Sequence, residues 1–277
     1  MTTSSFVDLP LSGRTVSIEH AFIAPERTAA PLVVFLHEGL GSLAMWKDYP
    51  RALCDAGGFR GFVYSRPGYG RSTPRAKDER WPVAFMHAQA QEMLPALFDA
   101  VGIGRVAGDR PWLFGHSDGG SIALLHAATF PAAAGGVVAV APHVMVEDVS
   151  IESIRAARTA YLTTDLRARL ARYHDDPDSA FWGWNDVWLD PEFRDWSILA
   201  MLRHVQCPVL AIQGEDDEYG TLAQIDAIAR TVAGSESVVL RGSGHSPHRD
   251  RPDALTRAAI DFISRHAATR AHQGGVQ

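Results

Sequence analysis

Short runs of apolar residues recur along the chain and alternate with longer stretches of helical periodicity. The runs that are apolar almost throughout lie at residues 31–36, 61–64, 112–114, 136–141, 208–212 and 237–240. A strand covered by helices on both faces exposes no polar side, so a continuous apolar run is typical of it. Strands that alternate with helices indicate the α/β class, with a mostly parallel central sheet and helices on both faces. Residues 15–23 alternate weakly, which predicts a further strand at an edge of this sheet.

The alternation stops between residues 143 and 204. This stretch contains helical segments within residues 151–173 and an aromatic run at residues 181–188, but no convincing strand. In a parallel sheet, ligand sites form at the carboxyl ends of the strands, and an insertion after a central strand lies at that edge. We therefore expect a core of residues 1–142 and 205–277 and a helical cap of residues 143–204 that roofs the site.

The composition excludes several classes of function. The chain has 277 residues, of which 46% are hydrophobic and 21% charged, enough for a sizeable buried core. A net charge of −6 and scattered basic residues indicate no nucleic-acid partner. No apolar stretch reaches membrane-spanning length, and residues 1–13 lack the basic and apolar regions of a secretion signal. We therefore expect a cytoplasmic protein without a membrane partner.

No metal or cofactor site stands out in the sequence. Cys54 and Cys207 fit neither a disulfide framework nor a metal site, and the histidines outside the motifs below show no metal-ligand spacing. We therefore expect no metal and no cofactor, and a small molecule as the binding partner. The sequence leaves the oligomeric state open.

The stretch from Gly115 to Gly120 carries the clearest chemistry. It reads Gly-His-Ser-Asp-Gly-Gly and lies between an apolar run and a helical segment that begins near Ile122. A serine nucleophile needs a sharp strand-to-helix turn, where small neighbours allow a strained backbone and close packing of helix on strand. The pattern therefore predicts Ser117 as a nucleophile. The turn also directs backbone N–H groups at the start of the helix, with that of Asp118 among them, toward an oxyanion.

A serine hydroxyl needs a base, and the base needs an acid that orients it. The loop at residues 214–220 follows one predicted strand and is rich in carboxylates. The loop at residues 241–248 follows the next strand and contains two histidines. Serine, then acid, then histidine is the chain order expected for a nucleophile at such a turn.

Several motifs together resemble the α/β-hydrolase superfamily, and in particular its capped members, over residues 30–266. They are the His-x-Gly-x-Gly-Ser loop at His37, the Gly-x-Gly-x-Ser loop at residues 68–72, the turn at Ser117, and a late Gly-x-x-Asp and Gly-His pair. The resemblance implies the α/β-hydrolase fold with a helical cap inserted after a central strand. Residues 65–67 read Ser-Arg-Pro where relatives often carry an acidic residue, a substitution that the sequence does not explain.

The resemblance also implies which residues complete the site. In the family the acid lies three residues after a Gly that ends a strand, which matches Asp217 after Gly214. The family's base follows a small Gly-rich turn, which matches His245. The remaining candidates of the two loops are three carboxylates and one histidine: Glu215, Asp216, Glu218 and His248.

For the oxyanion, the resemblance implies the backbone N–H groups of Asp118 and of Gly39, in the loop after the first buried strand. The chain departs from the family pattern at Glu38, where relatives usually have Gly. A carboxylate near an oxyanion opposes the charge that must be stabilised. Glu38 is therefore expected either to turn away and pair with an arginine such as Arg66 or Arg71, or to contact a polar or cationic part of the substrate.

Several aromatic residues are candidates for substrate contact. The tryptophans of the insertion lie close together in the sequence: Trp182, Trp184, Trp188 and Trp196. Such density is typical of a small cap packed on its base. The alternative is that one or two of these indoles line an apolar acyl or aromatic pocket and that His248 touches the substrate. His116, beside the nucleophile, is expected to pack rather than to transfer protons.

The leading hypothesis is a serine hydrolase that cleaves a small or medium carboxylic ester, thioester or lactone through an acyl-enzyme. Haloalkane dehalogenases and epoxide hydrolases of this fold use a carboxylate nucleophile, which Ser117 does not supply. One alternative is a C–C bond hydrolase of dienoate ring-fission products, which would need a carboxylate-binding arginine such as Arg155, Arg158 or Arg194. The other is a small-molecule receptor on the same fold, with slow turnover.

Overall fold

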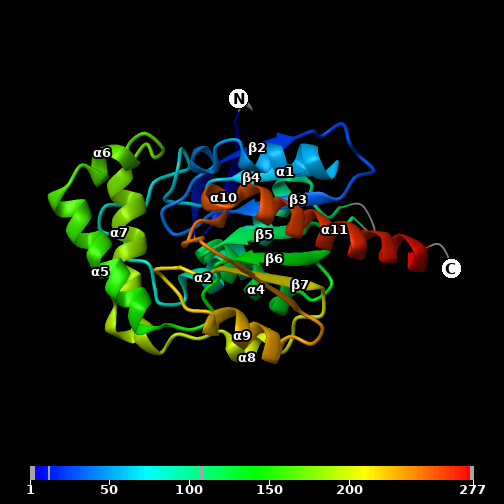
Figure 1. Cartoon of the computed structure of the whole chain (residues 1–277). Helices are drawn as coiled ribbons and strands as arrows, with labels where there is room; N and C mark the ends of the chain where they lie inside the picture. Colours follow the sequence, from blue (N-terminus) through cyan, green and yellow to red (C-terminus); the bar gives the residue numbers. More distant parts are fainter. Residues whose placement is uncertain (1–3, 12, 106–108, 275–277) are drawn as a thin grey trace.

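The computed structural model of the protein describes residues 4–11, 13–105 and 109–274. Its centre is an eight-stranded sheet with the order β1-β2-β4-β3-β5-β6-β7-β8 (Figure 1). The strands are β1 (Ser5–Leu11), β2 (Arg14–Ile23), β3 (Leu32–Leu36), β4 (Arg60–Tyr64), β5 (Trp112–His116), β6 (Gly136–Val140), β7 (Val209–Gly214) and β8 (Glu236–Leu240). The six strands from β4 to β8 in this order run parallel, whereas β1 and β2 are antiparallel to their neighbours. The predicted mostly parallel sheet is therefore confirmed.

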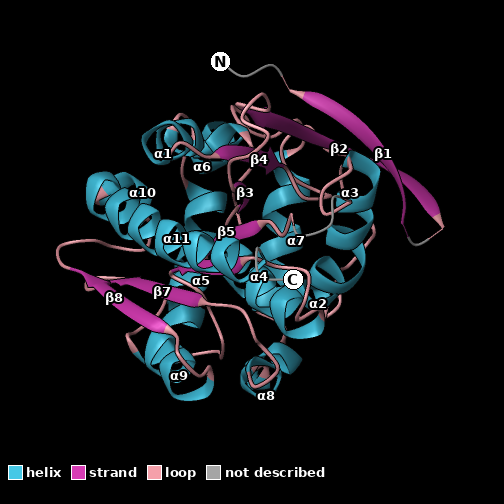
Figure 2. Ribbon diagram, turned by 90° about the vertical axis from the view of Figure 1, so that its right-hand side faces the viewer, coloured by secondary structure: helices cyan, strands magenta, loops and turns pink. Residues whose placement is uncertain are grey.

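The central strands β3, β5 and β6 are buried along their whole length. Helices cover both of their faces, so neither face needs polar side chains and the sequence shows no alternation there. Figure 2 shows this layering from the side. One face packs against α1 (Tyr49–Gly57) and α11 (Pro252–Gly274). The other packs against α3 (Leu94–Val101), α4 (Asp118–Thr129) and α9 (Ala223–Thr231).

The strand expected at residues 15–23 exists as β2, but the prediction that it forms an edge was wrong. β1 lies outside it, with Ser5 opposite His20 and Leu11 opposite Arg14. Of the residues of β1, only Leu9 is buried. A strand with so little buried surface leaves too weak an apolar pattern to be recognised in a sequence.

The helical stretch before β5, over residues 85–101, is divided into three pieces. They are α2 (Phe85–Ala88), the π-helical turn η2 (Gln89–Met93) and α3. Pro95 falls in the first turn of α3, where a helix tolerates a missing N–H group. The remaining short elements of the core are η1 (Ala44–Trp46) and α10 (Pro247–Asp250).

The chain between β6 and β7 is helical, and most of it stands beside the sheet as a separate group in Figure 1. Its elements are α5 (Asp148–Thr163), α6 (Leu166–Leu170), α7 (Pro177–Trp188), η3 (Pro191–Asp195) and α8 (Leu199–Leu202). Its buried aromatic side chains belong to the same hydrophobic cluster as the buried aliphatic side chains of α4. The insertion is thus packed on the core rather than tethered to it. None of the helices in the described part of the chain is both long and apolar enough to cross a membrane.

Candidate active site

Ser117 occupies a sharp turn between β5 and α4. Its backbone has φ 52° and ψ −121°, a conformation that a residue with a side chain rarely adopts. Glycines make the turn possible, because a Cβ on Gly119 would lie 2.1 Å from the carbonyl oxygen of Leu36, and one on Gly115 would lie 2.2 Å from that of Gly119. The first turn of α4 therefore lies directly against the ends of β3 and β5, and this packing holds the serine in its strained conformation.

The structure brings together Ser117, His245 and Asp217, which lie on three separate loops. The Oγ of Ser117 is 2.9 Å from Nε2 of His245. On the other side of the ring, Nδ1 is 2.9 and 3.0 Å from the two carboxylate oxygens of Asp217. A carboxylate only accepts, so Nδ1 donates to it, and Nε2 is free to accept the serine proton. This is the arrangement that activates a serine hydroxyl for nucleophilic attack.

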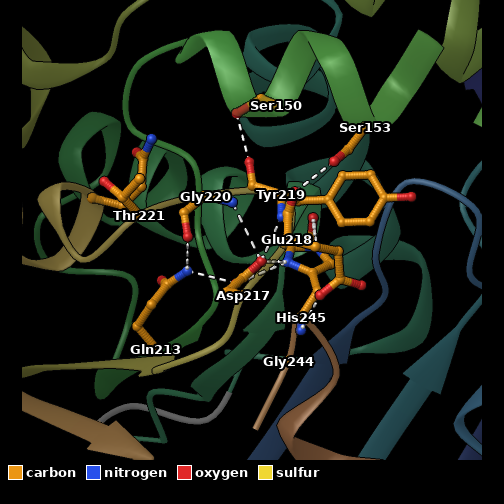
Figure 3. A network of polar contacts seen from close by, with 12 residues as sticks. Ser150, Ser153, Gln213, Asp217, Glu218, Tyr219, Gly220, Thr221, Gly244 and His245 are labelled. Carbon is orange, nitrogen blue, oxygen red and sulfur yellow. Dashed lines mark hydrogen bonds and ion pairs between the residues drawn. The ribbon is translucent and has the colours of Figure 1, made fainter. Parts of the chain in front are cut away.

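The Asp217 carboxylate is held by its own loop (Figure 3). The N–H groups of Tyr219 and Gly220 donate to Oδ1 over 2.8 and 3.3 Å, and Nε2 of Gln213 donates to Oδ2 over 2.5 Å. Burial alone would raise the pKa of Asp217, but the hydrogen bond and charge of His245 and the Tyr219 N–H hold it below its ordinary value. Asp217 is therefore ionised at neutral pH and able to orient a histidine.

The other carboxylates of this loop have different surroundings. Glu215 and Asp216 are exposed. Glu218 accepts the backbone N–H of His245 over 3.0 Å, so it braces the histidine loop without touching the ring nitrogens. Of the four candidates, only Asp217 has a hydrogen bond to the imidazole among the described contacts.

The insertion contacts the acid loop directly, a feature that sequence reasoning missed. Two serines of α5 donate to backbone carbonyls of the loop: Ser150 to Tyr219 over 2.6 Å, and Ser153 to Glu218 over 2.5 Å (Figure 3). Sequence reasoning also missed the hydrogen bond from Gln213 to Asp217. A polar residue near the end of an otherwise apolar strand could have indicated it, and the Gln213 side chain is buried there.

Gly39 and Asp118 lie on adjoining loops, at the ends of β3 and β5. The Asp118 side chain is buried, and its Oδ1 accepts the indole N–H of Trp188 over 3.2 Å. Its Oδ2 lies 3.8 Å from Nη2 of Arg66. Burial raises the pKa of Asp118, and the charge of Arg66 only partly offsets this effect. The side chain of Asp118 therefore serves in packing the loops, which leaves its backbone N–H as the candidate oxyanion donor.

Glu38 lies beside an arginine, as one of the two expectations held, but that arginine is Arg249 and not Arg66 or Arg71. Its Oε2 lies 3.4 Å from Nδ1 of His116, and its Oε1 lies 3.8 Å from Nη2 of Arg249. Arg66 instead binds the backbone carbonyl of Glu38. Burial opposes ionisation of this carboxyl, but the hydrogen bond and charge of His116 hold the pKa of Glu38 well below its usual range. The partner was unpredictable because it comes from the turn next to the nucleophile, far away in the sequence.

His116 and His248 contact core aromatic residues of η1 and α1: His116 contacts Trp46, and His248 contacts Tyr49. Nε2 of His116 donates to the backbone carbonyl of His245 over 2.6 Å. The ring of His248 is 4.9 Å from that of His116 and 5.1 Å from that of Trp46, measured between centroids. The described ring contacts of His248 are thus with core aromatics and His116 rather than with Ser117. Burial lowers the pKa of His248 to about 3, so the ring is neutral.

The three candidate tryptophans of α7 have different positions. A Cβ on Gly39 would lie 2.2 Å from the indole nitrogen of Trp184, so this indole covers the loop after β3. Trp188 is buried and bonded to Asp118, as described above. Trp182 instead contacts the guanidinium of Arg158, 5.3 Å from its ring centroid. Trp184 and Trp188 therefore lie against the two loops that flank Ser117, whereas the structure does not bring Trp182 to them.

Among the described residues, no group of three His, Cys, Asp or Glu side chains is arranged to hold a metal ion. The polar side chains that the structure brings together at Ser117 are those of His245 and, through it, Asp217.

Known proteins resemble this chain in sequence. It matches a family described as the alpha/beta hydrolase family over residues 33–258. The serine hydrolase BPHL of Homo sapiens is 26% identical over 208 residues, which cover 71% of this chain and 66% of the human protein. The similarity thus spans slightly less than two thirds of that relative.

Solved structures share the fold. An esterase from Thermogutta terrifontis superimposes with a TM-score of 0.72 at 18% identity, covering 95% of this chain and 99% of the other. A structure described for carboxylesterases of the thaumarchaeon Nitrososphaera gargenis gives 0.75 at 20% identity, covering 96% and 100%. The predicted α/β-hydrolase fold is confirmed. The family match extends over most of the length of this chain, and the chain therefore belongs to the alpha/beta hydrolase family.

Proposed function

We propose that this hydrolase is a serine hydrolase that cleaves a small or medium carboxylic ester, thioester or lactone. The observation that carries the proposal is the continuous hydrogen-bonded chain from Ser117 through His245 to Asp217. Each member has the partner that its role requires, and the acid is held ionised by its surroundings.

The mechanism follows from this geometry. Ser117 attacks the substrate carbonyl as Nε2 of His245 takes its proton, and Asp217 stabilises the resulting imidazolium. The N–H groups of Gly39 and Asp118 stabilise the oxyanion. His245 returns the proton to the leaving group, and water then hydrolyses the acyl-enzyme by the same steps.

The alternatives receive less support. A C–C hydrolase needs an arginine for the substrate carboxylate; Arg158 lies 3.4 Å from Asp186 and Arg194 is paired with Asp148, which leaves Arg155, without an ion pair among the described residues, as the candidate. A receptor on this fold would keep the same triad, so it is distinguished by a ligand-induced shift in Tm without turnover.

The test combines kinetics with covalent labelling. On a panel of short aryl esters, thioesters and lactones, Ser117→Ala should lower kcat by about 1,000-fold or more. A fluorophosphonate should label the wild type and not this variant. Ser121→Ala, one helical turn further along α4, is the matched control and should still be labelled. Wild-type turnover by Ser117→Ala would refute the proposal, and decay of a coloured ring-fission product without ester hydrolysis would favour C–C cleavage.

A further inference from the structure

Arg66 is a buried cation in the loop after β4. Its side chain is 1% exposed. Its guanidinium lies 4.6 Å from the centroid of the Tyr69 ring, and its nearest described carboxylate oxygen, on Asp118, is 3.8 Å away. Burying a charge is costly unless the protein gives it partners. The shortest contact of this guanidinium is to the backbone: Nη2 donates to the carbonyl oxygen of Glu38 over 2.8 Å.

The Glu38 carbonyl also accepts hydrogen bonds within its own loop, after β3: from the backbone N–H of Gly41 over 3.0 Å and from the side chain of His37. Nδ1 of His37 lies 2.7 Å from the same oxygen. Nε2 of His37 accepts the backbone N–H of Arg66 over 3.0 Å, so the ring proton is on Nδ1 and is donated to the carbonyl. Burial, followed by the charge of Arg66, lowers the pKa of His37 well below its ordinary value, in agreement with a neutral ring. The carbonyl is therefore held by three donors, of which Arg66 is the only one from another loop.

The orientation of this carbonyl determines that of the next N–H group. In a trans peptide the C=O of Glu38 and the N–H of Gly39 point in opposite directions in one plane. Because the carbonyl faces Arg66 and His37, the Gly39 N–H is turned away from both. A rotation of this peptide would break all three hydrogen bonds and leave a guanidinium buried without its closest partner.

The same guanidinium reaches the second candidate donor. Asp118 follows Ser117, and its side chain lies beside Arg66. The close approach of Gly119 to the carbonyls of Leu36 and His37 puts the two loops against each other. Arg66 thus contacts one residue of each loop: Glu38 after β3 and Asp118 after β5.

We propose that Arg66 is a positioning residue for the oxyanion hole, fixing the Glu38–Gly39 peptide so that the Gly39 N–H faces the developing oxyanion. The inference rests on the proposed function, since it concerns the transition state of that reaction. A donor that is already oriented needs no reorganisation during the reaction, which is the source of its catalytic value. This role gives a reason for the arginine of the Ser-Arg-Pro segment; nothing in the structure explains why the segment lacks the acidic residue that relatives often carry.

The test is Arg66→Met, which keeps the length of the side chain and removes the charge and the donors. Loss of one oriented oxyanion donor should lower kcat about 100-fold and leave KM within about threefold. The affinity for an aryl trifluoromethyl ketone, which forms a tetrahedral adduct with the serine, should fall by a similar factor. If Arg66→Met is too unstable to assay, Arg66→Met/Asp118→Asn leaves no carboxylate opposite the missing charge and gives the same readouts. Arg66→Lys, which keeps a cationic donor, should recover part of kcat.

The matched control is Arg60→Met, at the start of the same strand. Arg60 also donates to a backbone carbonyl, that of Ala30, and pairs with an aspartate, Asp109. It lies at the opposite end of β4, so its loss should lower Tm without lowering kcat. A kcat for Arg66→Met within threefold of wild type, or a lower kcat with unchanged ketone affinity, would overturn the inference. Failure of the proposed function is a separate result, because the wild type would then show neither ester turnover nor labelling of Ser117.

Discussion

Nε2 of His116 lies 2.6 Å from the backbone carbonyl oxygen of His245. The residue before Ser117 is thereby bonded to the backbone of the residue proposed to take the serine proton. Nδ1 of the same ring faces Glu38, whose carboxylate also accepts. Both ring nitrogens of His116 therefore face oxygen acceptors, one on the His245 loop and one on Glu38. The acidic residue that departs from the family pattern thus contacts the side chain that supports the loop of the candidate base.

Replacing His116 should lower turnover more than binding. His116→Leu removes the donor to the His245 carbonyl, and kcat should fall about 10- to 100-fold because the imidazole loses its alignment. His116→Gln retains an N–H group and should lose less. Steady-state kinetics on one aryl ester, together with circular dichroism, would check this result. Equal losses for the two variants would mean that bulk, not the hydrogen bond, matters at this position.

Glu38→Gln tests whether Glu38 contacts the substrate or supports His116. Removing the charged partner of His116 should lower the free energy of unfolding by about 1–3 kcal/mol. The ratio of kcat/KM between neutral and cationic esters should stay the same, since the carboxylate is engaged by His116 and Arg249. Arg249→Gln is the control. Its side chain is 43% exposed, so it should cost less than about 1 kcal/mol. A selective loss on cationic esters would instead establish substrate contact.

Gly39→Ala should disturb the loop through Trp184. The added methyl would lie 2.2 Å from the indole nitrogen, so the indole or the loop must move. We expect kcat to fall by about tenfold or more, because the movement displaces an oxyanion donor. Trp184→Leu in the same chain should restore part of this loss. A double-mutant cycle measures the effect, and strictly additive losses would show that the two residues do not meet.

The free energy of unfolding should fall as the pH drops below about 6.5, the ordinary pKa of histidine. Burial lowers the pKa of both His143 and His248 to about 3. Between these values the unfolded chain binds protons that the folded chain does not, so acid favours unfolding. Each histidine contributes about 1.4 kcal/mol per pH unit in this window. Urea unfolding at pH 7 and pH 5 should therefore differ by about 2 kcal/mol less in His248→Gln than in the wild type.

Sequence patterns predicted the sheet because its central strands are buried on both faces, which leaves continuous apolar runs. They could not reveal β1, whose side chains are mostly exposed. Helical spacing could have predicted which tryptophans of α7 face the core. Trp184 and Trp188 are four residues apart and share a helix face, whereas Trp182 does not. Only the first two lie against the loops around Ser117.

The candidate site was predictable where it depends on local turn chemistry. Ser117, Asp217 and His245 each follow a strand in a recognisable loop. The partners of Glu38 and Arg66 depend on how separate loops pack, and no spacing along the chain encodes that packing. Arg66 is buried and Glu38 partly buried near the end of β3, where a small difference in loop position changes which polar atom is nearest.

Helix α5 is bonded to the loop that carries Asp217 through Ser150 and Ser153. A movement of α5 away from the core would remove these two supports from the loop backbone, while the N–H groups of Tyr219 and Gly220 and the amide of Gln213 would still hold the Asp217 carboxylate. The insertion and the acid loop are thereby mechanically coupled: a shift of α5 is transmitted to the backbone beside Asp217, two residues or fewer from the carboxylate that faces His245.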